Sequence, residues 1–132
     1  MRPRSLSDGF TLLELMVVMS LIVILASLAL VQYRQSVTLS REAVLKEDLF
    51  RMNEAIDQYY ADKNKYPETL EDLVSAGYLR QIPLDPFTRS ASTWQTVPPE
   101  PDPSNPSSAY GVYQVKSGAD GVGTDGRAYA EW

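Results

Sequence analysis

The chain has 132 residues and a formal net charge of −5, and it contains neither His nor Cys. The acidic balance argues against binding nucleic acid through a basic surface, and no disulfide can form. Because the commonest general base and the thiol nucleophile are missing, and because the sequence has no glycine-rich phosphate loop or Ser–Lys constellation, it predicts a protein that is not an enzyme.

An apolar run near the N-terminus follows a short hydrophilic leader. The leader, residues 1–9, carries Arg2 and Arg4, and the apolar run covers residues 10–31. About 22 residues at about 1.5 Å rise per residue make a helix of about 33 Å, long enough to cross the hydrocarbon core of a bilayer. We therefore predict a membrane-spanning helix, with the basic leader in the cytoplasm and the later residues on the other side.

A cleaved secretory signal is the alternative interpretation of this N-terminus. Arg2 and Arg4 would then be its basic region, and Ser27-Leu28-Ala29 its cleavage site. However, the apolar run is longer than the about 7–15 residues usual in such signals, and an acid inside it, Glu14, is unexpected. The sequence favours a helix that is retained.

Glu14 is unusual because it lies inside an apolar helix. A carboxylate at the centre of a membrane helix costs about 2.5–3.5 kcal/mol on insertion scales. The simple interpretation is that the side chain reaches the headgroup region. Alternatively, if the chain were cut after Gly9, Phe10 would carry a new α-amine, normally protonated at pH 7. The amine of one copy could then neutralise Glu14 of its neighbour.

The stretch Gly9-Phe10-Thr11-Leu12-Leu13-Glu14, after a basic leader and before a long apolar helix, resembles the class III signal of type IV pilins and type II secretion pseudopilins. The resemblance implies that a membrane prepilin peptidase cuts between Gly9 and Phe10 and methylates the new amine of Phe10. It also implies that Glu14 helps to set the register of subunits in a helical filament.

Two positions depart from the pattern of that family. Asp8 places a negative charge beside the cleavage site. Val31 stands where many relatives have a helix-kinking proline, which predicts a straighter membrane helix.

The helix is expected to continue beyond the apolar run, because residues 32–62 contain neither Pro nor Gly. Apolar residues recur there in steps of four and three, which is the spacing of one buried helical face. These residues are Leu45, Leu49, Met52, Ile56 and Tyr59. The sequence thus predicts one helix from about residue 10 to about 62, whose second half belongs to a globular periplasmic domain, residues 32–132.

Turn signals follow this helix. Asn64-Lys65-Tyr66-Pro67 should end it, since proline biases the preceding residue away from helix. Thr69-Leu70-Glu71-Asp72 has the pattern of a capping box for a short helix, and Gly77 fits its C′ position. The Tyr66-Pro67 pair, together with Pro83-Leu84-Asp85-Pro86-Phe87, resembles the major, G-type pseudopilins.

Three strands are predicted after these turns, on their β-branched and aromatic content: residues 93–97, 110–115 and 127–132. They would form a small antiparallel sheet across the amphipathic half of the helix, giving a pilin-like α+β fold. The proline-rich residues 98–106 are expected to form an irregular, exposed connection, with variable filament surface or partner contact as the functional alternative.

Residues 116–126, which we call the Gly/Asp loop, combine four glycines with Asp120 and Asp125. Glycines allow tight curvature and carboxylates are ligands for hard cations, so the residues alone fit either a hairpin turn or a calcium loop that lacks the EF-hand spacing. The loop resembles the calcium-binding Gly-Ala-Asp-Gly loop of major pseudopilins. That resemblance implies calcium as a cofactor, with the carboxylates of Asp120 and Asp125 as ligands, although the loop is shorter here and lacks paired aspartates. Backbone carbonyls of the loop could complete the calcium shell, and we take those of Ser117 and Val122 as the candidates.

Together these features predict a structural subunit that polymerises into a periplasmic type II secretion pseudopilus and drives protein export across the outer membrane. The expected partners are further copies in a homo-oligomeric filament, prepilin peptidase, the inner-membrane assembly platform, minor pseudopilins and membrane lipid. The expected location is the inner membrane, single-pass, and the filament after assembly. The alternatives are a type IV pilus subunit for adhesion or motility, and a membrane-anchored binding module that never polymerises.

Overall fold

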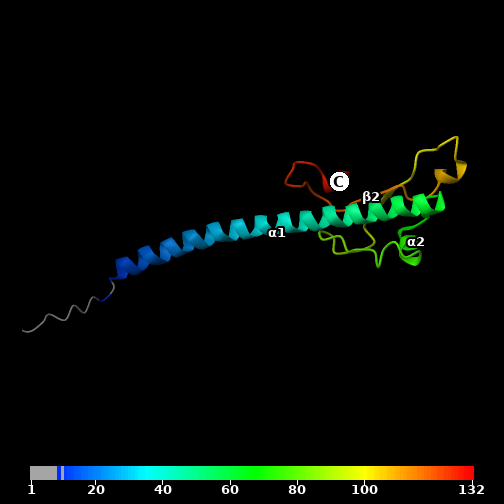
Figure 1. Cartoon of the computed structure of the whole chain (residues 1–132). Helices are drawn as coiled ribbons and strands as arrows, with labels where there is room; N and C mark the ends of the chain where they lie inside the picture. Colours follow the sequence, from blue (N-terminus) through cyan, green and yellow to red (C-terminus); the bar gives the residue numbers. More distant parts are fainter. Residues whose placement is uncertain (1–8, 10) are drawn as a thin grey trace, which may run out of the picture. The chain divides into compact units, whose positions relative to one another are not determined.

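The computed structural model describes residues 9 and 11–132 (Figure 1). The described residues divide into two compact units, one that ends at Thr38 and one that covers Leu39–Trp132. The elements in chain order are helix α1 (Leu12–Lys63), helix α2 (Leu70–Ser75), strand β1 (Gln95–Val97), 3-10 helix η1 (Pro106–Ala109), strand β2 (Gln114–Lys116) and 3-10 helix η2 (Tyr129–Glu131). A long N-terminal helix with a small antiparallel sheet confirms the predicted pilin-like α+β class.

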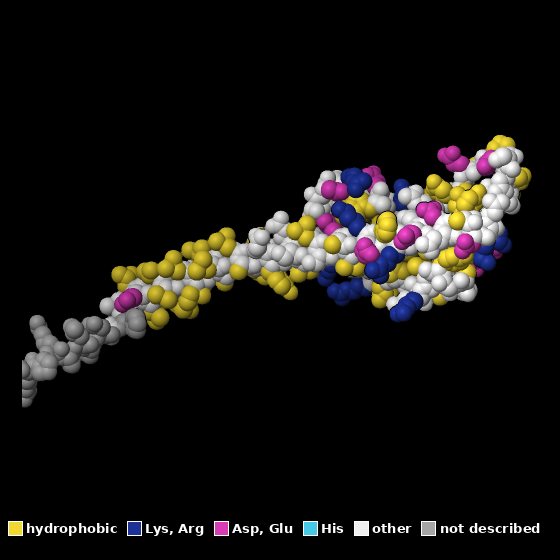
Figure 2. All heavy atoms as spheres, in the orientation of Figure 1, with side chains coloured by type: hydrophobic (Ala, Val, Ile, Leu, Met, Phe, Trp, Pro, Cys, Tyr) yellow, Lys and Arg dark blue, Asp and Glu magenta, His cyan; other side chains and the backbone are white. Residues whose placement is uncertain are grey.

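In the first unit, residues 12–31 of α1 carry almost only apolar side chains and all are exposed, and Figure 2 shows them on the face in view. The hydroxyls of Ser20 and Ser27 donate to the carbonyls of Met16 and Val23, each at 2.7 Å, so their polar hydrogens are satisfied within the helix. The helix continues through Val31 without a break. By length and composition it could cross a membrane.

In the second unit, one face of α1 forms the centre of the core. The five residues of the predicted apolar stripe are at most 7% exposed, and Ala55 joins them. Leu73 of α2, Trp94, Val115 of β2 and Tyr129 belong to the same cluster. The side-chain amide of Asn53 also pairs with the backbone of Val115, accepting its N–H at 2.9 Å and donating to its carbonyl at 3.3 Å. The stripe therefore fixes which face of α1 packs against the sheet.

The local signals at the helix ends are confirmed. After α1, Asn64 takes a positive φ of 54°. Asp72 accepts the backbone N–H groups of Thr69 at 3.1 Å and Glu68 at 2.9 Å, which caps the start of α2. At the end of α2, Gly77 has φ 85°, and the N–H of Tyr78 donates to the carbonyl of Leu73 at 2.9 Å, as in a Schellman motif.

The sheet has two strands in the described part of the chain, whereas three were predicted. Strands β1 and β2 pair antiparallel, with Thr96 opposite Val115. The prediction of a third strand at Arg127–Trp132 was wrong, because this stretch holds only an isolated bridge between Val122 and Ala128, followed by η2. Tyr129 and Trp132 bring their rings together, 5.1 Å apart, instead of alternating across a sheet. Their aromatic content therefore reflects core packing.

The proline-rich connection is irregular, as predicted. Residues 98–105 contain no strand or helix, and most of them are exposed. Pro99 is buried and Asn105 is half-buried. Whether this connection contacts a partner stays a prediction.

Candidate functional site

The predicted assembly residue, Glu14, lies in the first turn of α1. Its backbone N–H donates to the Thr11 hydroxyl at 3.2 Å, and the N–H of Leu15 donates to the Thr11 carbonyl at 3.1 Å, so Thr11 caps the helix. The exposed Glu14 makes no ion pair within the described residues. The arrangement presents one carboxylate on an apolar surface, where a cation of another molecule could reach it.

The two predicted processing residues differ in what the structure says of them. Gly9 is exposed, and a Cβ added there would meet no atom within 4 Å. Phe10 and the leader residues 1–8, including Asp8, lie outside the described residues. Cleavage after Gly9 and methylation of Phe10 therefore stay predictions.

The structure reveals a buried carboxylate that the sequence analysis missed. Glu42 of α1 is only 4% exposed. Its Oε1 accepts the N–H of Thr124 and the hydroxyl of Tyr129, each at 2.8 Å, and its Oε2 accepts the Thr124 hydroxyl at 2.6 Å. Burial raises the pKa of the Glu42 carboxyl, but these hydrogen bonds, with Lys46 nearby, outweigh burial and hold the pKa below its ordinary value.

An aromatic cluster surrounds this carboxylate. Tyr129 stacks on Phe87 with ring centroids 4.3 Å apart, and it meets Trp132 edge-on. The ammonium of Lys46, one turn after Glu42, lies 4.6 Å from the Trp132 ring centroid. Residues 117–132, which we call the C-terminal segment, are thus held against α1 by one acid and one base of that helix.

Two of the four predicted calcium ligands already use side-chain oxygens in hydrogen bonds within the protein. Both carboxylate oxygens of Asp125 accept hydrogen bonds from Arg127, one from its N–H and one from its Nε, each at 3.0 Å. The hydroxyl of the buried Ser117 donates to Asp85 at 2.8 Å. Asp120 and Val122 are exposed.

Within the described residues, no group of three or more Asp, Glu, His or Cys side chains is placed to hold a metal. The carboxylates of the Gly/Asp loop as folded therefore do not form a ready-made calcium site, since Asp125 is already paired and such ions take six to eight oxygen ligands. The calcium site stays a prediction.

Comparison with known proteins places the chain in a family. Residues 4–30 match the family model described as the prokaryotic N-terminal methylation motif. The protein named type II secretion system core protein G from Klebsiella pneumoniae is 34% identical over 107 residues, covering 69% of this chain and 74% of that protein. The chain belongs to the type II secretion system core protein G family.

Two further relatives carry the same name. The Escherichia coli (strain K12) protein is 33% identical over 103 residues, covering 66% of this chain and 71% of its own length. The Klebsiella michiganensis protein is 31% identical over 140 residues, covering 92% of this chain and 91% of its own length. No solved structure matches the chain. As a pseudopilin with an exposed apolar helix, this core protein G family member is a membrane-anchored structural subunit.

The element that resembles core protein G around Asp85 has a clear role in this family member. Asp85 is fully buried, and its Oδ1 accepts the backbone N–H groups of Phe87 at 2.8 Å and Thr88 at 3.3 Å. Its Oδ2 accepts the Ser117 hydroxyl, whose oxygen in turn accepts the N–H of Ala119 at 3.1 Å. The element therefore connects the extended segment after α2 to the C-terminal segment.

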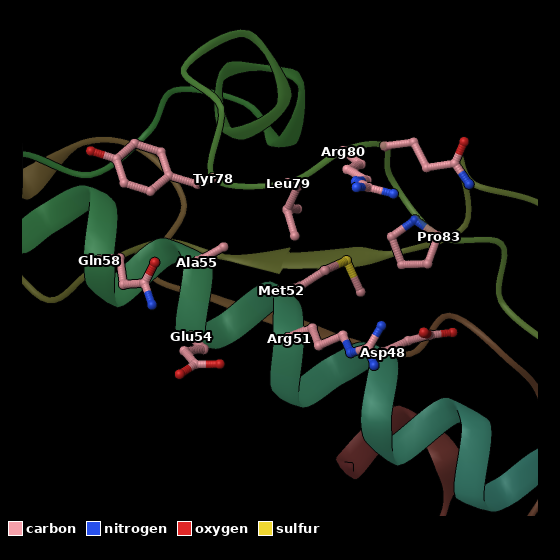
Figure 3. Close-up of a pocket in the computed structure, with 11 residues that line it drawn as sticks. Asp48, Arg51, Met52, Glu54, Ala55, Gln58, Tyr78, Leu79, Arg80 and Pro83 are labelled. Atoms are coloured by element: carbon pink, nitrogen blue, oxygen red, sulfur yellow. The ribbon is translucent and has the colours of Figure 1, made fainter.

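A pocket of about 470 Å³ lies elsewhere on this subunit, between α1 and residues 78–83 (Figure 3). Asp48 and Arg51 on α1 and Arg80 on the facing segment place both signs of charge around the apolar side chains of Met52 and Leu79. The pocket shares no lining residue with the Glu42 cluster. Its mixed charge favours no single class of ligand.

The ionisation of Tyr129 gives a test of the Glu42 cluster at high pH. Burial, with the Glu42 hydrogen bond, raises the pKa of Tyr129 to about 12. Because the ordinary pKa is about 10, the stabilisation from the neutral phenol should be complete below pH of about 10 and lost as the pH rises toward about 12. The measurement is the phenolate absorbance of the wild type minus that of Tyr129→Phe, followed as the pH is raised. We expect this difference to reach half of its full value at a pH near 12. A midpoint near the ordinary value would show that the phenol is not buried against a carboxylate.

Proposed function

We propose that this chain is the structural subunit of a type II secretion pseudopilus, a filament whose growth drives proteins across the outer membrane. The observation that carries the proposal is the exposed Glu14 in the first turn of α1, whose residues 12–31 are otherwise almost entirely apolar, within the N-terminal methylation motif of residues 4–30. An apolar surface of this extent needs lipid before assembly and other copies of the helix afterwards.

Processing and assembly follow from the same residues. Prepilin peptidase cuts between Gly9 and Phe10, and the methylated amine of Phe10 pairs with Glu14 of a neighbouring copy. Before assembly the subunit is anchored in the inner membrane, with residues 1–9 cytoplasmic, residues 10–31 spanning the bilayer and residues 32–132 periplasmic. Its further partners are the inner-membrane assembly platform and the minor pseudopilins.

Mass spectrometry of the native N-terminus tests the processing step. We expect the mature chain to begin at Phe10 with one added methyl group. A mature chain that begins at Met1 or at Leu30 contradicts the proposal, since the first keeps the leader and the second removes the apolar helix.

Deletion of the gene separates the secretion function from its alternatives. We expect exported proteins to remain in the periplasm while surface pili and motility are unchanged. Loss of pili with normal export would instead identify a type IV pilus subunit. Normal export together with normal pili would favour an anchored module that does not polymerise.

A further inference from the structure

The C-terminal segment is organised around a negative charge that helix α1 supplies. Three donors of the segment reach one carboxylate: the N–H and hydroxyl of Thr124 and the hydroxyl of Tyr129, at 2.6–2.8 Å from the oxygens of Glu42. We propose that Glu42 takes the place of a bound metal ion in this subunit, so that the C-terminal segment folds against α1 without calcium.

The polar groups around Glu42 are hydrogen-bond donors, and this supports the proposal that Glu42 replaces a metal ion. A calcium site gathers oxygen atoms that present lone pairs to the ion, commonly six to eight of them. Around Glu42 the segment instead presents hydrogen-bond donors, which suit an anion. The Glu42 carboxylate satisfies all three, so the centre of this arrangement is already occupied by a side chain of the protein.

One of the two acids of the Gly/Asp loop is also neutralised within the loop. Asp125 is bound through both oxygens by Arg127, two residues further along the chain. Residue 127 thus supplies a positive charge where a calcium ion would otherwise be required. The hydrogen bonds from Arg127 hold the pKa of Asp125 below its ordinary value.

At two positions of the Gly/Asp loop, glycine is required by close packing and not by metal binding. A Cβ on Gly123 would lie 2.4 Å from the Trp132 ring, and a Cβ on Gly118 would lie 1.8 Å from the carbonyl oxygen of Thr93. Both positions therefore need glycine for close packing. Two of the four glycines in the loop are thus accounted for by the close approach of the segment to its neighbours.

Thermal unfolding of the full chain in detergent, with a chelator or with excess calcium chloride, tests the proposal. We expect the wild-type Tm to be the same in both conditions. A ligand present at about a hundred times its Kd would raise the Tm by about 10 °C in a domain of this size. Such a rise, lost in Asp120→Asn, would overturn the proposal and establish a metal site in the Gly/Asp loop.

Variants on α1 test the role of Glu42 directly. We expect Glu42→Gln to lower the Tm by about 10 °C, because the amide no longer offers two charged acceptors to three donors, and calcium should not restore the loss. The matched control is Glu47→Gln, since Glu47 is exposed and only pairs with Arg51 on the same helix at 2.8 Å. Its Tm should change by less than about 3 °C.

A milder variant covers the case in which Glu42→Gln does not fold. Thr124→Val removes one hydroxyl donor and keeps the backbone N–H, so its Tm should fall by about half as much as that of Glu42→Gln. Equal Tm values for Thr124→Val and the wild type would overturn the role of Glu42. These experiments measure folding, so their failure would leave the proposed function in secretion intact.

Discussion

Glu14→Ala should abolish pseudopilus filaments while the subunit still inserts into the membrane at its normal level. In the filament, each Glu14 would face the amine of Phe10 from a neighbouring copy in an apolar environment. Removing the carboxylate leaves that amine unpaired, at a cost of about 2.5–3.5 kcal/mol for each subunit added. A loss of this size weakens each addition step about a hundredfold or more. Insertion should not suffer, because the substitution makes the helix more apolar.

The measurement is the yield of sheared filaments on an immunoblot, beside the amount of subunit in the membrane fraction. Ser20→Ala is the matched control in the same apolar stretch, because the Ser20 hydroxyl is satisfied by the Met16 carbonyl of its own helix. Its filament yield should equal that of the wild type. Glu14→Gln separates charge from shape and should fail like Glu14→Ala. Normal filaments from either Glu14 variant would exclude an assembly role for this carboxylate.

The parts of the fold that could be predicted are those encoded by neighbouring residues. The spacing from Leu45 to Tyr59 reports one face of a helix, and that face is buried because the rest of the unit packs on it. Asp72 and Gly77 mark the ends of α2 through bonds that span only a few residues. Such signals survive in any tertiary context in which the helix forms.

The parts that could not be predicted depend on residues far apart in the chain. Glu42 lies on a charged helical stretch, where acids are usually solvated, and its partner Thr124 is 82 residues away. The prediction of a third strand was wrong for a similar reason. Tyr129 and Trp132 have strand-like side chains, but their rings are used in packing around Glu42 and Lys46.

The candidate site also has a part that could be predicted from neighbouring residues and a part that could not. The motif that contains Gly9 and Glu14 could be recognised because its residues are consecutive, and the comparisons match it over residues 4–30. The role of each residue in that motif stays a prediction, since it depends on a second copy of the chain. For the Gly/Asp loop, composition could not distinguish a metal site from a hydrogen-bonded turn. The partners of Asp125 and Ser117 decide that question only in three dimensions.

Gly118→Ala should be the most damaging single-methyl change in the globular unit. Gly118 follows β2, and extending the pairing of Gln95 with Lys116 by two residues places it opposite Thr93. A Cβ there would lie 1.8 Å from the carbonyl oxygen of Thr93 and 2.9 Å from its carbonyl carbon. Both are backbone atoms, and the neighbouring Ser117 is tied to the buried Asp85, so neither strand can move aside easily. We expect a loss of about 3 kcal/mol or more in the free energy of unfolding.

For a domain of this size that loss lowers the Tm by about 12 °C or more, which thermal unfolding followed by circular dichroism can measure. Gly126→Ala is the matched control. Gly126 has φ 83°, and a Cβ added there would meet no atom within 4 Å, so alanine suffers only the left-handed backbone, about 1 kcal/mol. A smaller Tm loss for Gly118→Ala than for Gly126→Ala would mean that Thr93 and Gly118 do not approach closely. In that case the contact between Gly118 and Thr93 would not hold the end of β2 against β1, and it would not fix the start of the C-terminal segment.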